Sequence, residues 1–184
     1  DYSLKITGKC GNSSFSIAEE KLWHSQSHFS VTVENPVLWW PRFMGKPSLY
    51  NVSITLLKNG LIVDEKEIHF GIRKIKLSKT DIIDENGNGE FLFEVNGKPM
   101  YIMGTNWVPL DAFHSRDTER LKQAFDLLLE ENCNAVRCWG GNVYESDEFF
   151  ELCDKYGIIV WQDFAMGCAS YPQNDNLCDR IRIE

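Results

Sequence analysis

The stretch Asn134-Ala-Val-Arg-Cys-Trp-Gly-Gly141 decides the fold of this chain. It is a short apolar run that ends in a guanidinium, an indole and two glycines. Such a run is typical of a parallel barrel strand at the point where it opens into a polar, aromatic-walled pocket. Residues 101–107, which end in Asn-Trp, and residues 158–164, which contain Trp-Gln-Asp, share this design. The three segments predict three strands that deliver polar and aromatic side chains to one rim.

A helix is expected between the first and second of these strands, over residues 118–133. Asp117 has the short acidic side chain that suits an N-cap. Four apolar residues recur at helical spacing and define one buried face: Leu121, Ala124, Phe125 and Leu128.

A second helix is expected between the second and third strands. It begins at Ser146, places Glu145, Asp147 and Glu148 near its positive end, and stops at Gly157. Its expected buried residues are Phe149, Phe150, Cys153 and Tyr156. Strands that alternate with helices favour a parallel sheet with helical crossovers.

The first hundred residues follow a different period. Apolar residues alternate over residues 29–33 and again over residues 50–56, as in half-buried strands. Asn59-Gly60 and Asn96-Gly97 each sit between two such runs, and Asn-Gly readily takes the positive φ values of a type I′ turn. The first half therefore predicts antiparallel hairpins in an immunoglobulin-like β-sandwich.

Size and composition narrow the class of protein. The chain has 184 residues, 43% of them hydrophobic, which is ample for a buried core. A net charge of -8 argues against nucleic acid as a partner, because phosphate binding requires clustered Lys and Arg. No apolar run approaches the roughly 20 residues that span a bilayer, so no membrane partner is expected. Any ligand is expected to be neutral or cationic.

No metal or cofactor is expected. The four histidines and six cysteines lack metal-ligand spacing, so mostly free thiols are expected. Residues 84–90 begin like a calcium loop, but position twelve is Val95 where a bidentate glutamate is required. A plain Asn/Gly turn is the better interpretation.

The chain is expected to hold two incomplete domains. Residues 1–78 show fewer strands than the usual seven or so of an immunoglobulin-like sandwich, and its first strands are expected to be missing. Residues 79–184 hold the first βα units of a TIM (β/α)8 barrel, which needs about 250 residues to close. The fold class is thus multidomain β plus α/β. An unclosed barrel leaves strand edges unpaired, which favours self-association of the isolated chain.

Several motifs together resemble the β-mannosidases of glycoside hydrolase family 2. The resemblance covers the chain from about residue 35 to its end, and its motifs in order and spacing are highly specific. They are Asn35-Pro-Val-Leu-Trp-Trp-Pro41, Gly71-Ile-Arg73, Gly104-Thr-Asn-Trp-Val-Pro-Leu-Asp-Ala-Phe113, Arg137-Cys-Trp-Gly-Gly141, Tyr156-Gly-Ile-Ile-Val-Trp-Gln-Asp-Phe164 and Ala169-Ser-Tyr-Pro172.

The resemblance implies an enzyme that releases terminal β-mannose with retention from oligosaccharides or glycans. It implies a jelly-roll domain, an immunoglobulin-like sandwich and a catalytic barrel, with the remaining domains of the parent enzyme as partners of this chain. It also implies two catalytic glutamates on later barrel strands, so no catalytic residue is expected here. A periplasmic, secreted or lysosomal location is implied by the resemblance alone.

Five residues are candidates for the mannose-binding pocket: Asn106, Trp107, Arg137, Trp139 and Asp163. Arg137 suits orientation of a carboxylate, or a salt bridge inside the barrel. Trp139 suits a wall against a sugar ring, or core packing. Asn106 and Trp107 suit hydroxyl recognition, or simple termination of the strand. Asp163 either binds hydroxyls or braces Arg137.

Two aromatic or cationic features suit domain packing better than ligand binding. Trp39 and Trp40 are neighbours on a strand and point to opposite faces, so they cannot stack on one sugar. Arg73 is expected to hydrogen-bond between the domains.

Two rival functions remain open at this point. The same fold is used by related β-galactosidases, β-glucuronidases and exo-glucosaminidases, so the sugar can differ. A non-catalytic carbohydrate-binding or scaffold module is the rival from another class.

Overall fold

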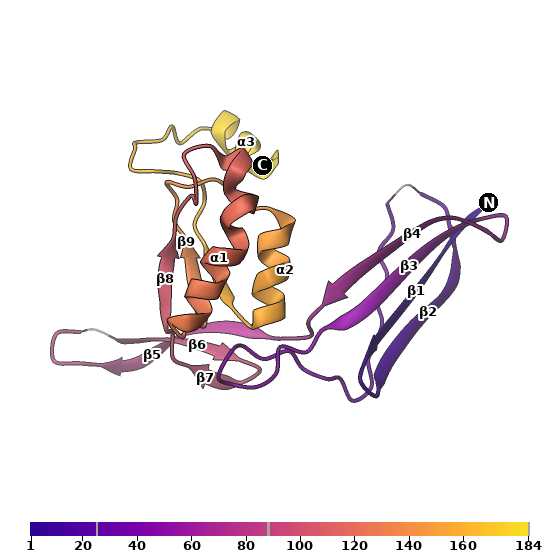
Figure 1. The fold of residues 1–184 in the computed structure, drawn as a ribbon, viewed down its shortest axis with the longest axis horizontal. Coiled ribbons are helices and arrows are strands. Elements are labelled where there is room, and N and C mark those ends of the chain that lie inside the picture. The colour runs from indigo at the N-terminus through magenta and orange to yellow at the C-terminus, as the bar shows by residue number, and fades with distance from the viewer. Residues whose placement is uncertain (25, 88, 184) are drawn as a thin grey trace.

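The first part of the structure is one antiparallel sheet. The computed structural model describes residues 1–24, 26–87 and 89–183. Four strands lie in the order β2-β1-β3-β4, namely β1 (Tyr2–Cys10), β2 (Ser13–Leu22), β3 (Tyr50–Lys58) and β4 (Leu61–Phe70). Figure 1 shows this sheet standing apart from the helices at the other end of the molecule.

Both predicted Asn-Gly hairpins are confirmed. Asn59 and Gly60 join β3 to β4 with φ values of 53° and 80°. Asn96 and Gly97 join β6 (Gly89–Val95) to β7 (Lys98–Met100) with φ values of 51° and 76°. Two consecutive positive φ values are the signature of the type I′ turn, whose twist matches that of the paired strands.

The fold class predicted from the sequence, a partial sandwich followed by the start of a TIM barrel, is confirmed. The strand expected over residues 29–33 is wrong, because those residues belong to no strand. An alternating pattern gives a strand only where a neighbour supplies ladder hydrogen bonds, and none of the described strands pairs with this segment.

A small antiparallel sheet connects the two parts. Its order is β5-β6-β7, with β5 spanning Ile75–Ile83. The predicted domain boundary between residues 78 and 79 falls within β5. The hairpin of β5 and β6 lies under the sheet of β8 and β9 in Figure 1. Residue 88 of the expected 84–90 turn lies outside the described residues, but Asn86 N donates to Asp84 Oδ1 at 2.9 Å, as in an Asx-turn.

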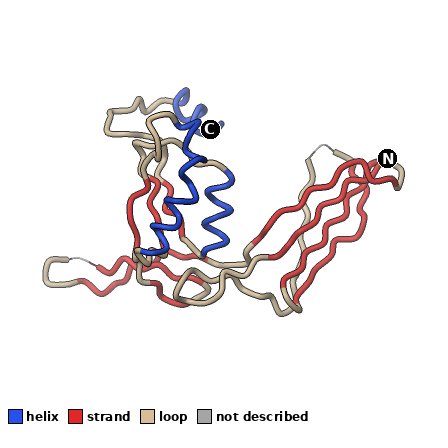
Figure 2. Tube along the Cα trace, viewed as in Figure 1, coloured by secondary structure: helices blue, strands red, loops and turns tan. Residues whose placement is uncertain are grey.

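The remaining residues form the predicted βα units. The strands β8 (Gly104–Trp107), β9 (Ala135–Cys138) and β10 (Ile159–Gln162) lie in the order β10-β9-β8, and both pairings are parallel. The intervening elements are η1 (His114–Arg116), α1 (Asp117–Glu130) and α2 (Asp147–Tyr156), and α3 (Asp175–Ile183) follows β10. Figure 2 shows α1 and α2 side by side against the three strands.

The helix α1 matches its predicted face but not its predicted cap. Leu121, Phe125 and Leu128 are buried, as expected. Arg116 occupies the N-cap position, so the assignment of Asp117 as N-cap is wrong. The Asp117 carboxylate instead accepts a hydrogen bond from Asp111 N at 2.8 Å and contacts His114 Nδ1 at 3.1 Å. The helix thus begins at Asp117, one residue earlier than predicted, directly after the 3-10 turn.

The helix α2 begins after Ser146 and ends at Gly157, both as predicted. Gly157 has φ 74°, the left-handed conformation that closes many helices. Phe149 and Cys153 are buried. The expected burial of Phe150 is wrong, since it is 39% exposed. Its side chain lines a groove between α2 and the edge of β4 rather than the core.

The core of this part lies between the helices and the strands. Trp107, Phe125 and Phe149 form a triangle of rings with centroid separations of 5.6, 5.0 and 5.7 Å. Aromatic groups in such tilted arrangements add favourable quadrupole contacts to their area burial. No helix among the described residues is both long enough and apolar enough to cross a membrane.

The two parts of the molecule meet at the C-terminal end of α2. Trp39 Nε1 donates to Asp154 O at 2.7 Å, and Arg73 Nη2 pairs with Asp154 Oδ1 at 3.1 Å. Arg42 N donates to Gly157 O at 2.8 Å, and a Cβ on Gly157 would lie 2.7 Å from Arg42 N. The predicted packing role of Trp39 and the interdomain role of Arg73 are confirmed.

Candidate functional site

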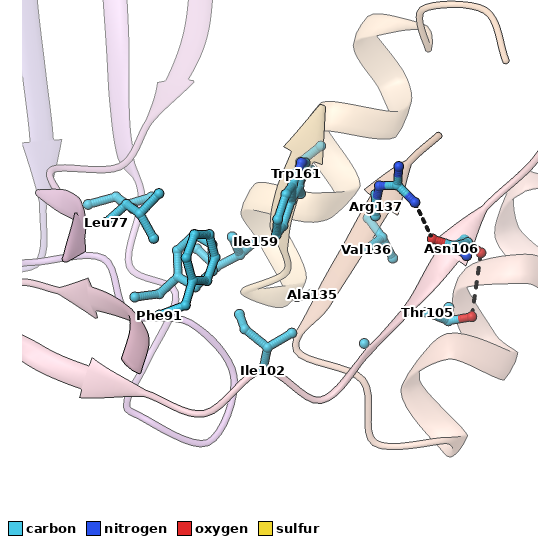
Figure 3. A pocket seen from close by; sticks show the side chains of 14 residues that line it. Leu77, Phe91, Ile102, Thr105, Asn106, Ala135, Val136, Arg137, Ile159 and Trp161 are labelled. Atoms are coloured by element: carbon cyan, nitrogen blue, oxygen red, sulfur yellow. Dashed lines mark hydrogen bonds between the residues drawn. The ribbon is translucent and has the colours of Figure 1, made fainter. Parts of the chain in front are cut away.

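Three strand-end side chains occupy one row across the parallel sheet. The register pairs Asn106 of β8 with Arg137 of β9, and Arg137 with Trp161 of β10. Side chains at the same level of paired strands point to the same face of a sheet. All three residues line the face opposite the helices, and Figure 3 shows them around a common hollow.

Arg137 is the centre of the polar group. Its Nη2 donates to Asp163 Oδ2 at 2.6 Å and its Nε donates to Asp163 Oδ1 at 3.3 Å, a bidentate pairing. Its Nη1 donates to Asn106 Oδ1 at 3.4 Å (Figure 3). The structure therefore brings Asn106, Arg137 and Asp163 together from three different strands or strand ends.

The Asp163 carboxylate is held in its charged form. Hydrogen bonds from the Arg137 side chain, and then from Gly140 N at 3.2 Å, lower the pKa of Asp163 below its usual value, against the opposing effect of desolvation. A carboxylate that accepts several charge-assisted hydrogen bonds is a fixed acceptor rather than a proton donor.

The hollow below this polar group is large and mostly apolar. Its volume is about 800 Å³, and its walls come from the inner face of the three strands and from the hairpin of β5 and β6. Phe91 stacks on Trp161 with ring centroids 6.0 Å apart. The apolar walls belong to the inner face of the barrel strands, where side chains pack in layers, whereas the polar groups lie at the carboxyl ends of the strands, the end at which TIM-barrel enzymes place their active sites.

Trp139 lies in a tight turn directly after β9. Asn142 N donates to Trp139 O at 2.9 Å and closes the turn. A Cβ on Gly141 would lie 2.0 Å from the Trp139 ring, and a Cβ on Gly140 would lie 2.7 Å from Phe164 O. Both glycines are therefore required for the indole and the following loop to pack as they do. The indole is 40% exposed, so it retains a free face.

Trp107 lies apart from Asn106, Arg137 and Asp163. It is only 5% exposed, and its ring packs among the helices of the core. Its Nε1 donates to Glu145 Oε1 at 3.0 Å. Because it is one residue beyond Asn106, the pleat turns it to the opposite face of the sheet.

Glu145 does not belong to the first turn of α2, and its assignment as a first-turn charge is wrong. The helix begins two residues later, and the Glu145 carboxylate turns inward to Trp107 and to Asn142 Nδ2, at 3.0 and 3.1 Å. Desolvation raises the pKa of Glu145, while the hydrogen bonds from Asn142 and Trp107 oppose that shift.

The thiols close to the site are not poised for nucleophilic chemistry. All six cysteines are free, and Cys138, at the end of β9, is completely buried. Burial raises the pKa of Cys138 to about 12. Reactive cysteines require the opposite shift. The described residues also contain no cluster of His, Cys, Asp or Glu that suits a metal ion.

Sequence reasoning missed three residues of the site: Trp161, Asn142 and Glu145. Trp161 could have been found from the sequence, because it lies two residues before Asp163 at the end of a predicted strand. In the structure it is paired with Arg137 in the same row across the sheet. Asn142 and Glu145 lie in an irregular loop, where no periodic pattern reports which way a side chain points.

Two domain families match the chain. Residues 2–73 match "Glycosyl hydrolases family 2", and residues 88–181 match "Glycosyl hydrolases family 2, TIM barrel domain". The β-mannosidase of Capra hircus is 38% identical over 147 residues, which are 79% of this chain and 17% of that protein. The β-mannosidase B of Aspergillus clavatus is 33% identical across 100% of this chain and 21% of that protein.

Solved structures show the same arrangement. The β-D-mannosidase of Dictyoglomus thermophilum has a TM-score of 0.80 and 33% identity, covering 98% of this chain and 23% of that chain. A β-glucuronidase of Parabacteroides merdae, at 20% identity and a TM-score of 0.68 over 89% of this chain and 20% of that chain, shares the fold alone.

The chain spans about a fifth of the length of these relatives, between 17% and 21% of the two named above. The barrel domain family alone accounts for about half of the 184 residues. The chain therefore belongs to glycosyl hydrolase family 2.

Proposed function

We propose that this chain is part of an exo-acting, retaining β-mannosidase that releases terminal β-mannose from oligosaccharides or glycans. The observation that carries the proposal is the Arg137 guanidinium, which joins Asn106 and Asp163 at the carboxyl ends of three parallel strands. Active sites of TIM-barrel enzymes lie at this end of the barrel. The three named relatives that are at least 33% identical to this chain are all described as β-mannosidases, and they support mannose as the sugar.

Within this proposal, the rim residues recognise one mannose unit. Asn106 offers both a donor and an acceptor to sugar hydroxyls, and Arg137 and Asp163 offer fixed charges on either side. The free face of Trp139 suits the apolar face of a pyranose ring. We assign Trp107 a supporting position behind the rim, since its ring packs in the core.

The reaction requires groups beyond those described. A retaining glycosidase uses two carboxyl groups about 5 to 5.5 Å apart, one as nucleophile and one as acid/base. Asp163 is already engaged by Arg137 and Gly140, and Glu145 is engaged by Trp107 behind the rim. We therefore expect residues 1–184 alone to bind sugar weakly and to leave glycosides intact, with the catalytic pair and the other domains supplied by the parent enzyme.

The experiment that tests this proposal uses the full-length parent enzyme. Its kcat/KM is measured on a panel of p-nitrophenyl β-glycosides, and the mannoside is expected to be preferred. A preference for the galactoside, glucuronide or glucosaminide would overturn the choice of sugar.

Variants of the parent enzyme test the site itself. Arg137→Ala is expected to lower kcat/KM by about 100-fold or more, because it removes the guanidinium that pairs with Asp163 and orients the rim. Arg116→Ala is the matched control: this arginine also pairs with an aspartate, Asp111, but at the end of η1, before α1. Equal losses in the two variants would show that Arg137 has no special position.

A further inference from the structure

A single carboxylate oxygen ties together two segments behind the rim. Glu145 Oε1 accepts hydrogen bonds from Trp107 Nε1, at the end of β8, and from Asn142 Nδ2, in the loop after β9. These donors are separated by 35 residues along the chain but share one acceptor. Loss of the acceptor would leave two partly buried donors unpaired, which is costly.

Asn142 connects Glu145 to the turn that contains Trp139. Its main-chain N–H closes that turn on Trp139 O at 2.9 Å, while its side chain is held by Glu145 at 3.1 Å. Asn142 is only 8% exposed, and its buried Oδ1 has no hydrogen-bond partner among the described residues. Within that part of the chain, the Asn142 side chain is held through its nitrogen, by Glu145.

This turn also determines the positions of the Trp139 indole and of the Gly140 N–H group. The indole is packed directly over Gly141, and Gly140 N donates to Asp163 Oδ2 at 3.2 Å. A shift of this turn therefore moves an exposed aromatic face and alters the carboxylate that holds Arg137.

Glu145 is not needed as a first-turn charge of α2. The first turn of α2 already carries Asp147 and Glu148, which suffice to favour its positive end. Burial of a third carboxylate nearby carries a desolvation cost that raises its pKa. A half-buried acid with two directional partners is the kind of group that fixes one local conformation.

We propose that Glu145 is a positioning residue of the sugar site, acting through Asn142 on the Trp139 turn. This inference rests on the proposed function, because it assumes that the turn borders the bound sugar. It differs from a general stabilising role in one respect: the effect of Glu145 on turnover passes through Trp139.

A double-mutant cycle in the full-length enzyme tests the inference, with kcat/KM for p-nitrophenyl β-mannoside as the readout. Glu145→Ala is expected to lower kcat/KM by about tenfold to 100-fold, as for displacement of a binding group by about 1 Å. Trp139→Ala is expected to lower it at least as much. The double variant should match Trp139→Ala alone, because coupled residues give non-additive effects. Additive losses, or an unchanged Glu145→Ala enzyme, would overturn the inference.

Two further variants control the cycle. Glu145→Gln keeps an acceptor oxygen for both donors and is expected to retain most of the activity. Glu148→Ala removes an exposed first-turn acid of α2 and is expected to leave kcat/KM unchanged. If Glu145→Ala does not fold, as judged by its thermal melt, Asn142→Ala takes its place in the same cycle with the same expected non-additivity.

The cycle also separates the inference from the function on which it rests. A wild-type enzyme that prefers another glycoside defeats the assignment of mannose, and the cycle is then run on that glycoside. Non-additivity there would still support the role of Glu145, and additivity would refute it.

Discussion

The two faces of the sheet formed by β8, β9 and β10 differ sharply. On the face toward the helices, Trp107, Val136 and Cys138 are at most 5% exposed. On the opposite face, Trp161 is 47% exposed and Arg137 projects toward Asn106 and Asp163. Alternate residues of the same short strands thus serve burial and chemistry separately. Substitutions on the first face should affect folding, and substitutions on the second should affect turnover.

The largest expected effect is on the helix-facing side. Phe149→Ala in the 184-residue chain is expected to lower the free energy of unfolding by about 3–5 kcal/mol, since it removes a fully buried ring from a close-packed cluster. Urea unfolding followed by far-UV circular dichroism measures this change.

The neighbouring residue provides the matched control. Phe150→Ala removes the same side chain from a position that is 39% exposed, so its cost should be much smaller. Similar midpoints for the two variants would mean that the ring triangle does not form the core.

A second, smaller effect is expected where the strands begin. Asn134 is 2% exposed; its Oδ1 accepts from Met103 N and its Nδ2 donates to Tyr101 O, both at 2.9 Å. Asn134→Ala leaves these two main-chain groups unpaired and is expected to cost about 1–3 kcal/mol of unfolding free energy. Gln123→Ala, on the exposed side of α1, should stay within about 0.5 kcal/mol of the parent chain. Matching results for Asn134 and Gln123 would show that this bridge carries no stability.

The smallest effect is expected on the hollow-facing side, and it depends on pH. The pKa of Asp163 is lowered in the folded state, so the unfolded chain takes up its proton first as the pH falls. The stabilisation from its pair with Arg137 should be complete above about pH 4 and be lost at lower pH, through the folded-state pKa. The stability difference between the parent chain and Asp163→Asn should therefore shrink on acidification. A difference that grows at low pH would contradict the lowered pKa.

Most of the fold was predictable because its signals are local and periodic. The Asn59-Gly60 turn and the parallel strands both follow from patterns within a few residues, and both are confirmed. The segment 29–33 failed for the opposite reason, since a strand depends on a neighbour that a local pattern does not report. The helix α3 was missed because it is only nine residues long and mostly polar, and none of its residues is buried.

The site was predictable only as far as strand register determines it. Asn106, Arg137 and Asp163 lie at equivalent strand ends, and the structure brings them together. Trp107 is adjacent to Asn106, yet the pleat sends it to the core. The inward turn of Glu145 depends on a loop conformation with several tertiary partners, which composition alone does not specify.

The ten residues of α2 link the sandwich junction to the loop beside the polar rim. At its C-terminal end, Asp154 accepts a hydrogen bond from Trp39 and pairs with Arg73, and Gly157 accepts a hydrogen bond from Arg42. Its N-terminal end lies two residues after Glu145. A helix of this length is a stiff rod of about 15 Å. We expect such a rod to act as a strut, so that a tilt of the sandwich would displace the loop that carries Trp139. Under the proposed function, the β-sandwich would thereby help to position the Trp139 side of the opening for the glycan.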